Sequence, residues 1–299
     1  MIEFRTLRER ELDAWYAHCD SVFHEEPGYF RKHFEWDPFR DNSLIFVAVD
    51  GGKIVSTVRV FDRIVWIAGR AVKMGGIGEV STKPEYREKG YAGTLLGMAI
   101  EAMRERRMPV SILFGDHPMY QRKSWQFYPV IFKRVTRALL PGLPEGARVR
   151  PFQPEDLPFI MGIYDLYAGR LDGAVQRSQA YWKQWVLPQW CHPIVLLSED
   201  RPVAYCCLSR DRQQNVLRIE ELNATPQGEE LLPGFLRAAA NESFDEINVY
   251  ARLIPRIDGH EFVGYRMMIR ANDEYIEDWI GERQTPWIRH AGMFAVDMF

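Results

Sequence analysis

The alternation of apolar and polar positions along the first 140 residues predicts strands and helices in turn. Apolar runs bounded by turn residues predict strands at 2–5, 44–50, 53–66 and 110–114, an extended segment at 70–82, and a tight turn at Asp50-Gly51-Gly52. Helical spacing predicts helices at about 9–23 and 91–107, an irregular or helical stretch up to residue 38, and a short helix starting at Met119. This order indicates an α/β fold with a mixed sheet rather than regular βαβ units.

The second half of the chain echoes the first half at three places, in the same order. Phe4-Arg5-Thr6-Leu7 is echoed by Val149-Arg150-Pro151-Phe152, and Tyr29-Phe30-Arg31-Lys32 by Tyr181-Trp182-Lys183-Gln184. The strand, turn and strand at 45–55 are echoed at 194–204, and a Pro/Gly-rich segment at 141–146 separates the two halves. A tandem repeat of one fold, with domains at 1–142 and 147–299, accounts for all three echoes. Two unrelated α/β domains with similar hairpins are the alternative.

Composition narrows the classes of function. The chain has 299 residues, 46% of them hydrophobic, and a net charge of −3, so neither a nucleic-acid partner nor a membrane partner is expected. No apolar run approaches the roughly 20 residues that span a bilayer, and no apolar signal segment stands at the N-terminus. The four cysteines form no C-x-x-C pair, so we expect reduced packing thiols, no metal site and a cytoplasmic location.

The loop between the extended segment and the second helix is suited to bind an anion. It reads Lys83-Pro84-Glu85-Tyr86-Arg87-Glu88-Lys89-Gly90-Tyr91-Ala92-Gly93. The first N–H groups of a helix lack intrahelical partners, and the helix dipole favours negative charge there. Gly90 would let a pyrophosphate approach the backbone closely, while Arg87 and Lys89 add positive charge.

This loop resembles the R/Q-x-x-G-x-G/A signature of the GNAT superfamily of acyl-CoA N-acyltransferases. The signature is Arg87-Glu88-Lys89-Gly90-Tyr91-Ala92, with Pro84 six residues before Gly90 as in the family. The resemblance implies a duplicated GNAT fold, α/β with a mixed, mainly antiparallel sheet, and acetyl-CoA as cosubstrate. It implies that the preceding strand lends backbone groups to the pantetheine arm. The cofactor site that follows consists of Val80, Ser81, Thr82, Arg87, Glu88, Lys89, Gly90, Tyr91 and Ala92.

A second feature supports the resemblance. GNAT proteins follow their fifth strand with a helix reading Y-x-x-x-G-F or G-W, and here Tyr120 and Trp125 match, while Ser124 replaces the glycine. In the family this tyrosine protonates the leaving thiolate. A phenol of pKa near 10 can donate to a thiolate of pKa about 8.5 without a large penalty. A purely packing role for Tyr120 is the alternative.

The group that takes the proton from an amine is less defined by sequence. Glu79, beside the cofactor segment, is the first candidate, and a solvent-facing structural glutamate is the alternative. Asp116 and His117 follow the fifth strand and are further candidates, although His117 could equally cap a loop.

The chain end offers another base by resemblance. The tandem arrangement and the ending Met293-Phe294-Ala295-Val296-Asp297-Met298-Phe299 look like the enhanced-intracellular-survival-type acetyltransferases, whose terminal phenylalanine carboxylate acts as the base. Phe299 matches that ending. This chain is shorter and lacks room for the full third domain of that type, so a tail that only straps the structure is the alternative.

The second half lacks the anion-binding loop. Thr225-Pro226-Gln227-Gly228-Glu229-Glu230 stands where that loop would lie, without a cation, and its two carboxylates would repel a pyrophosphate. We therefore expect a degenerate GNAT-like domain that forms a wall of the acceptor cleft. The acidic and aromatic stretch at 25–37 could hold a cationic amine or could be a solvated face.

Together these observations predict an enzyme, an acetyl-CoA-dependent N-acetyltransferase. The acetyl group would pass to a primary amine of a small molecule by direct attack, because no cysteine lies near the motif to form an acyl-enzyme. A non-catalytic acyl-CoA sensor is the alternative. A nucleotide site is disfavoured, because no P-loop or ribose-binding fingerprint is present. The sequence leaves the acceptor and the oligomeric state open, including a homo-oligomer.

Overall fold

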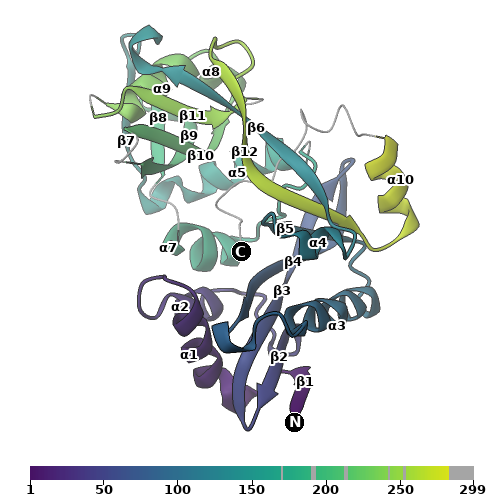
Figure 1. The fold of residues 1–299 in the computed structure, drawn as a ribbon. Coiled ribbons are helices and arrows are strands. Elements are labelled where there is room, and N and C mark those ends of the chain that lie inside the picture. Colours follow the sequence, from purple (N-terminus) through teal and green to yellow (C-terminus); the bar gives the residue numbers. More distant parts are fainter. Residues whose placement is uncertain (170, 190–192, 212–214, 242, 252–253, 283–299) are drawn as a thin grey trace.

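The computed structural model describes residues 1–169, 171–189, 193–211, 215–241, 243–251 and 254–282. Its strands form one mixed, mainly antiparallel sheet of 12 strands in the order β1-β2-β3-β4-β5-β12-β6-β11-β10-β9-β8-β7 (Figure 1). The strands are β1 (Ile2–Thr6), β2 (Ile45–Asp50), β3 (Lys53–Ile67), β4 (Arg70–Thr82), β5 (Val110–Phe114), β6 (Gln126–Thr136), β7 (Ala147–Pro151), β8 (Ile194–Ser198), β9 (Arg201–Asp211), β10 (Val216–Ala224), β11 (Glu246–Tyr250) and β12 (His260–Ala271).

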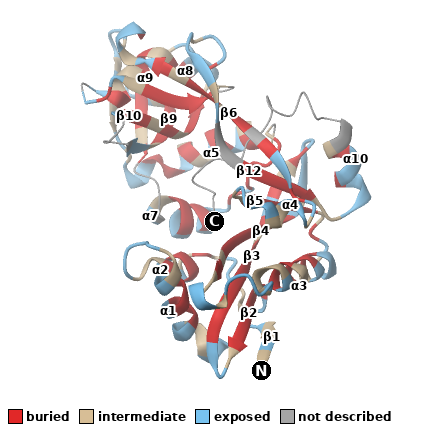
Figure 2. Ribbon diagram, viewed as in Figure 1, coloured by how far each residue is buried: buried red, intermediate tan, exposed pale blue. Residues whose placement is uncertain are grey.

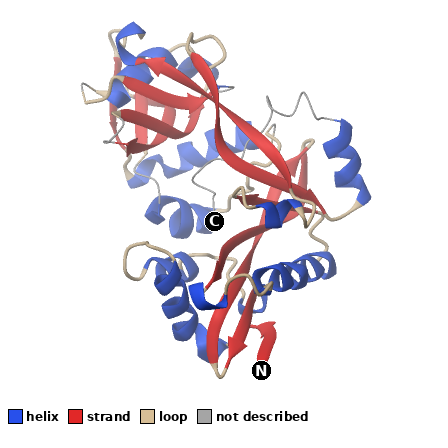
Figure 3. Ribbon diagram, viewed as in Figure 1, coloured by secondary structure: helices blue, strands red, loops and turns tan. Residues whose placement is uncertain are grey.

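Helices flank this sheet in both halves of the molecule (Figure 3). The α-helices are α1 (Leu12–Val22), α2 (Tyr29–Glu35), α3 (Tyr91–Glu105), α4 (Pro118–Gln121), α5 (Leu157–Ala168), α6 (Gln179–Tyr181), α7 (Leu187–Gln189), α8 (Pro226–Glu229), α9 (Leu232–Ala240) and α10 (Glu274–Glu282). The 3₁₀ turns are η1 (Glu9–Glu11), η2 (Asn42–Leu44), η3 (Pro84–Tyr86), η4 (Arg137–Leu139) and η5 (Pro154–Asp156), and η6 (Trp182–Val186) is a π-helical turn.

The apolar strand β2 is buried on both faces, which explains its continuous hydrophobic run. Ile45, Val47 and Val49 pack in one core with residues of α1 and α2. Phe46 and Ala48 point to the opposite face and pack in a second core with α3. Successive strand side chains alternate between faces, so one strand supplies both cores. The buried strands between these helices are visible in Figure 2.

The two halves share strands β6 and β12. β12 pairs with β5 through Met267–Ala271 and with β6 along most of its length, while β6 also pairs with β11. Each half therefore has five strands of its own and is completed by the same two long strands, which run between the halves in Figure 1. Because β12 lies late in the chain, the N-terminal sheet is complete only when the whole chain has folded.

The repeat noted in the sequence recurs as local structure. In the first half Arg5 pairs with Glu11 at 2.7 Å, and in the second half Arg150 pairs with Asp156 at 2.6 Å. In both halves the acidic residue also accepts the backbone N–H at the start of its 3₁₀ turn. The internal repeat thus extends to individual hydrogen bonds.

The strands and helices predicted for the first half are present, and α2 occupies the stretch predicted to be irregular or helical; β6 was not predicted. The prediction of reduced cysteines is wrong for Cys207, which is disulfide-bonded, whereas Cys19 and Cys206 are free and buried. Among the described residues, the helices are too short or too polar to cross a membrane. The division of the chain at residues 142–147 stays a prediction.

Candidate active site

The loop before α3 has the conformation that an anion site requires. Gly90 is the N-cap residue of α3 and adopts a left-handed conformation, with φ of 80°, and Glu88 has φ of 63°. No side chain caps the helix, and the first hydrogen bond at its start runs from the Thr94 N–H to the Gly90 carbonyl at 3.0 Å. The preceding N–H groups of the first turn therefore have no helical partner and are available to a bound anion.

Parallel strands β4 and β5 separate next to this loop. Their pairing runs from Met74 opposite Val110 to Ile77 opposite Leu113, while β4 continues to Thr82 alongside β3. The last residues of β4 thus have a ladder partner on one side and leave their other edge without one in the described sheet. An extended ligand arm could add to this edge as a short pseudo-strand.

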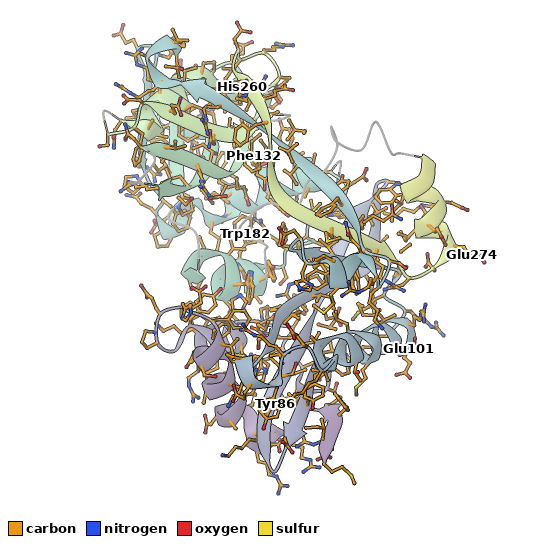
Figure 4. All side chains as sticks on the ribbon, in the orientation of Figure 1. Tyr86, Glu101, Phe132, Trp182, His260 and Glu274 are labelled. Carbon is orange, nitrogen blue, oxygen red and sulfur yellow. The ribbon has the colours of Figure 1, made fainter. Side chains whose placement is uncertain are left out.

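A pocket of about 700 Å³ joins the loop to the separated strands. Of the nine predicted cofactor residues, Lys89 alone is missing from its lining, and its Nζ instead donates to the Glu85 carbonyl at 3.0 Å. The pocket is lined by Val22, Phe23, Val80, Ser81, Thr82, Tyr86, Arg87, Glu88, Gly90, Tyr91, Ala92, Gly93, His117, Met119 and Arg122. Figure 4 labels Tyr86 within this N-terminal half.

The sequence did not indicate that Phe23, after α1, and Arg122, after α4, also line the pocket. Arg122 follows α4 directly and adds a cation, and Phe23 ends α1. For Arg122 the sequence did hold a signal, because this arginine stands two residues after the candidate acid Tyr120. The position of Phe23 follows from the packing of α1 on the sheet, which local sequence does not encode.

A buried histidine supports the strand side of the pocket. His18 of α1 lies with Nε2 at 2.9 Å from Ser81 Oγ and Nδ1 at 3.2 Å from the Ile54 carbonyl. The carbonyl can only accept, so the proton lies on Nδ1 and the serine hydroxyl donates to Nε2. Burial, with a smaller contribution from Lys83, lowers the pKa of His18 to about 4. A neutral imidazole therefore fixes Ser81 at the pocket wall.

Tyr120 is part-buried on α4, next to the pocket residue Met119. Its ring lies against Gly115, where an added Cβ would come within 3.0 Å of Cε2, and it contacts the Trp125 ring edge-on at 6.3 Å between centroids. Burial raises the pKa of Tyr120, so the phenol is protonated at neutral pH. The ring is held in place while its hydroxyl remains able to donate.

Glu79 is buried, which excludes the solvent-facing alternative. It has φ of 51° at a β-bulge, where Glu79 and Val80 lie opposite the single residue Val58 of β3. Its Oε1 atom lies 3.1 Å from His33 Nδ1 and 3.2 Å from Arg59 Nη1. The carboxylate of Glu79 thus faces His33 on α2 and Arg59 on β3.

Glu79 belongs to a buried charged cluster of Asp37, Arg59, Arg63, Glu79 and His33. Arg59 Nη2 donates to Asp37 Oδ2 at 2.7 Å, and Arg63 Nη1 lies 3.1 Å from Asp37 Oδ1. Burial is the largest single influence and would lower the pKa of Arg63, but the charges and hydrogen bonds of Asp37 and Tyr181 together outweigh it, so the pKa is raised. Two cations and two carboxylates balance in charge, with His33 neutral because burial lowers its pKa.

The C-terminal half covers this cluster with aromatic rings from α6 and η6. The Trp185 ring lies 4.6 Å from the His33 ring, and Arg63 lies over Trp185 at 4.9 Å and over Tyr181 at 5.2 Å. Trp182, in the same turn and labelled in Figure 4, is buried and packs against Tyr164 and Tyr205 of the second half. Within the acidic and aromatic stretch at 25–37, His33 and Asp37 are therefore buried, whereas Glu25 and Glu26 are exposed to solvent.

His117 and Phe299 were also predicted as candidates for the base. His117 lines the pocket, but its Nδ1 accepts the Met119 N–H at 3.2 Å, which is the capping role. Phe299 lies outside the described residues, so its role as base stays a prediction.

In the second half, the counterpart of Glu79 is fully enclosed. Glu79 stands five residues before Pro84, and Glu221 stands five residues before Pro226, again at a bulge. Both Glu221 oxygens accept from Arg177, at 3.1 and 2.7 Å, and Tyr205 also donates to Glu221. The pocket next to it, of about 540 Å³, is lined by Glu229 and Glu230 in the place of the cationic loop.

Comparison with known proteins identifies this architecture. Residues 3–128 match the family model described as "Acetyltransferase (GNAT) domain". This part of the chain is therefore similar to GNAT acetyltransferase domains, and the similarity supports acyl transfer as the general class of activity.

Solved structures share the fold over most of the chain. A GCN5-related N-acetyltransferase from Anabaena variabilis aligns with a TM-score of 0.73 at 16% identity, covering 91% of this chain and 73% of the other. A protein of unknown function from Enterococcus faecalis, described as a probable N-acyltransferase, aligns at 0.72 and 17%, with 91% and 73% covered. Eis1 from Mycobacterium abscessus aligns at 0.66 and 15%, with 91% and 74% covered. The sequence has no match among curated proteins.

Proposed function

We propose that this protein transfers an acetyl group from acetyl-CoA to a primary amine of a small molecule. The observation that carries the proposal is the pocket at the start of α3, where unpartnered backbone N–H groups, Arg87 and Arg122 meet the open edge of β4. In this proposal residues 1–142 form the catalytic domain, and residues 147–299 form a degenerate domain with the C-terminal tail.

The residues present fit a coenzyme A thioester. A Cβ added at Gly90 or Gly93 would meet no atom within 4 Å, so the space in front of the helix is open. The N-terminal end of α3 and the two arginines would hold the diphosphate, and the edge at Val80, Ser81 and Thr82 would hold the pantetheine arm. By contrast, Glu229 and Glu230 disfavour a diphosphate in the second half.

Tyr120 is the proposed acid. As the amine nitrogen bonds to the acyl carbon, the C–S bond breaks and the sulfur leaves with its electron pair. The protonated Tyr120 hydroxyl donates its proton to that sulfur, which completes the release of a thiol. The described residues contain no group of His, Cys, Asp or Glu able to hold a metal ion, and the proposed chemistry needs none.

Calorimetric titration of the full chain with acetyl-CoA, in parallel with ATP and NAD, tests the proposal. We expect binding of acetyl-CoA alone, followed by thiol release in the presence of at least one member of an amine panel. Binding without turnover across the panel would favour an acyl-CoA sensor, and preference for ATP or NAD would contradict the assignment of the pocket.

A further inference from the structure

Three buried polar atoms in the charged cluster have no partner in the described part of the chain. They are Nη2 of Arg63, Nε2 of His33 and Oε2 of Glu79. His33 and Glu79 are hydrogen-bonded to each other, and their side chains have exposed fractions of 3% and 4%. Leaving a buried polar atom unpaired costs on the order of 1–3 kcal/mol, so such atoms are rare in folded proteins. Their presence at one place indicates a site for a ligand or an ordered water.

The hydrogen bond between these two residues fixes the tautomer of His33. Glu79 Oε1 accepts from Arg59 as well as from His33, so the histidine proton lies on Nδ1. Nε2 therefore carries a free lone pair. This is the arrangement in which a carboxylate orients an imidazole to accept a proton on its far nitrogen.

The internal repeat provides a comparison within the same chain. At the counterpart Glu221, Arg177 and Tyr205 occupy both oxygens, and neither oxygen is without a partner. His33 itself corresponds to Trp185 in the echo of Tyr29-Phe30-Arg31-Lys32 at 181–184, so the second half lacks the imidazole. The unpartnered pair thus occurs in the half that has the cofactor loop.

We propose that His33 accepts the proton of the acceptor amine on Nε2, directly or through one buried water, while Glu79 acts as the positioning residue. The step is balanced: the amine nitrogen bonds to the acyl carbon and gives one proton to His33, and the departing sulfur takes one proton from Tyr120. The proton gained by His33 and the proton lost by Tyr120 exchange with solvent after product release. This inference rests on the proposed acetyl transfer and adds a residue to it.

The surroundings of His33 keep it neutral before the reaction. Burial lowers its pKa, and the charge of Arg59 on β3 acts in the same direction, whereas Glu79 on β4 and Asp37 after α2 oppose them. The Tyr29 ring on α2 stacks on the His33 ring, with 5.2 Å between the ring centroids, and the Trp185 ring on η6 also contacts the His33 ring. Neither of these two rings carries a charge. The net result is an imidazole that is a free base at neutral pH.

The test combines nuclear magnetic resonance with pH–rate profiles on the full chain. In ¹⁵N-histidine-labelled wild-type protein we expect His33 as the neutral Nδ1–H tautomer at pH 7. His33→Gln should lower kcat by about 10²- to 10⁴-fold while the Kd for acetyl-CoA stays within about twofold. The acidic limb of its kcat/KM profile should disappear, since a structural role alone would not remove that limb.

Two further variants separate catalysis from folding. Glu79→Gln removes a charge that raises the pKa of His33, so the acidic limb should shift to lower pH. His24→Gln, at an exposed histidine after α1, should leave the rate and the profile unchanged. If His33→Gln fails to fold, the position of the acidic limb in Glu79→Gln decides the question, and an unshifted limb would overturn the inference.

Failure of the proposed acetyl transfer and failure of the role proposed for His33 would give different results. Absence of acetyl-CoA binding and turnover in the wild type would remove the proposed function and this inference with it. Turnover in the wild type with an unchanged profile in His33→Gln, or an Nε2–H tautomer, would overturn the inference alone and leave acetyl transfer standing.

Discussion

Replacing Gly90 by alanine tests the anion site directly, because another glycine provides a matched control. Gly90 and Gly52 both have φ of 80°, and an added Cβ would meet no atom within 4 Å at either position. Gly52 lies in the turn between β2 and β3 and outside the cofactor pocket. The two substitutions therefore impose the same backbone strain, and they differ in whether a ligand uses the space.

The expected magnitudes follow from this geometry. A left-handed conformation costs a non-glycine residue about 1–2 kcal/mol, so both variants should lose a similar amount of unfolding free energy. At Gly90 the methyl group also occupies the space proposed for the diphosphate. Loss of one charge-assisted hydrogen bond, about 1.5–3 kcal/mol, corresponds to an increase in the Kd for acetyl-CoA of about 10- to 150-fold.

Calorimetric titration with acetyl-CoA and urea denaturation of the wild type, Gly90→Ala and Gly52→Ala provide the measurements. We expect similar urea midpoints for the two variants and weakened binding for Gly90→Ala alone. Unchanged affinity in Gly90→Ala, or equal weakening in both variants, would refute the placement of the diphosphate at this helix start.

Three further predictions concern the acid, the charged cluster and the supporting histidine. Tyr120→Phe should lower kcat by about 10²- to 10⁴-fold with acetyl-CoA affinity retained, and unchanged turnover would remove the assignment of the acid. Asp37→Ala leaves buried Arg59 and Arg63 without a shared carboxylate and should cost about 3–5 kcal/mol of unfolding free energy. Asp13→Ala, at an exposed pair with Arg31, should shift the urea midpoint far less, and equal shifts would contradict the role of burial. For His18 the folded pKa of about 4 lies below the unfolded value of 6.5, so the unfolded chain binds more protons between these values. Stability should therefore fall by about 3 kcal/mol as pH drops from about 6.5 to 4, and His18→Gln should show a flatter dependence than the wild type or His24→Gln.

Much of the first half could be predicted because its signals are local. The spacing of Leu95, Leu96, Ala99, Ile100 and Met103 defines one apolar face of α3, and all five are buried. The turn at Gly51 and Gly52 needs positive φ at both residues, and both have it. The loop at Gly90 combines a strand end, a proline and a glycine at fixed distances, so its shape follows from a dozen consecutive residues.

The sequence by itself determined the class of fold, the loop before α3 and the acidic replacement of that loop in the second half, because each depends on neighbours along the chain. Tertiary structure decided the rest. The insertion of β12 between β5 and β6 pairs residues that are distant in the chain, such as Met267 with Phe114 and His260 with Arg134, and no local pattern records such a partner. The meeting of His33, Arg59 and Glu79 joins α2, β3 and β4, and Trp185 reaches it from the other half. Burial then changes the chemistry of these side chains, since the same residues in water would be ordinary charges and hydrogen-bonded groups.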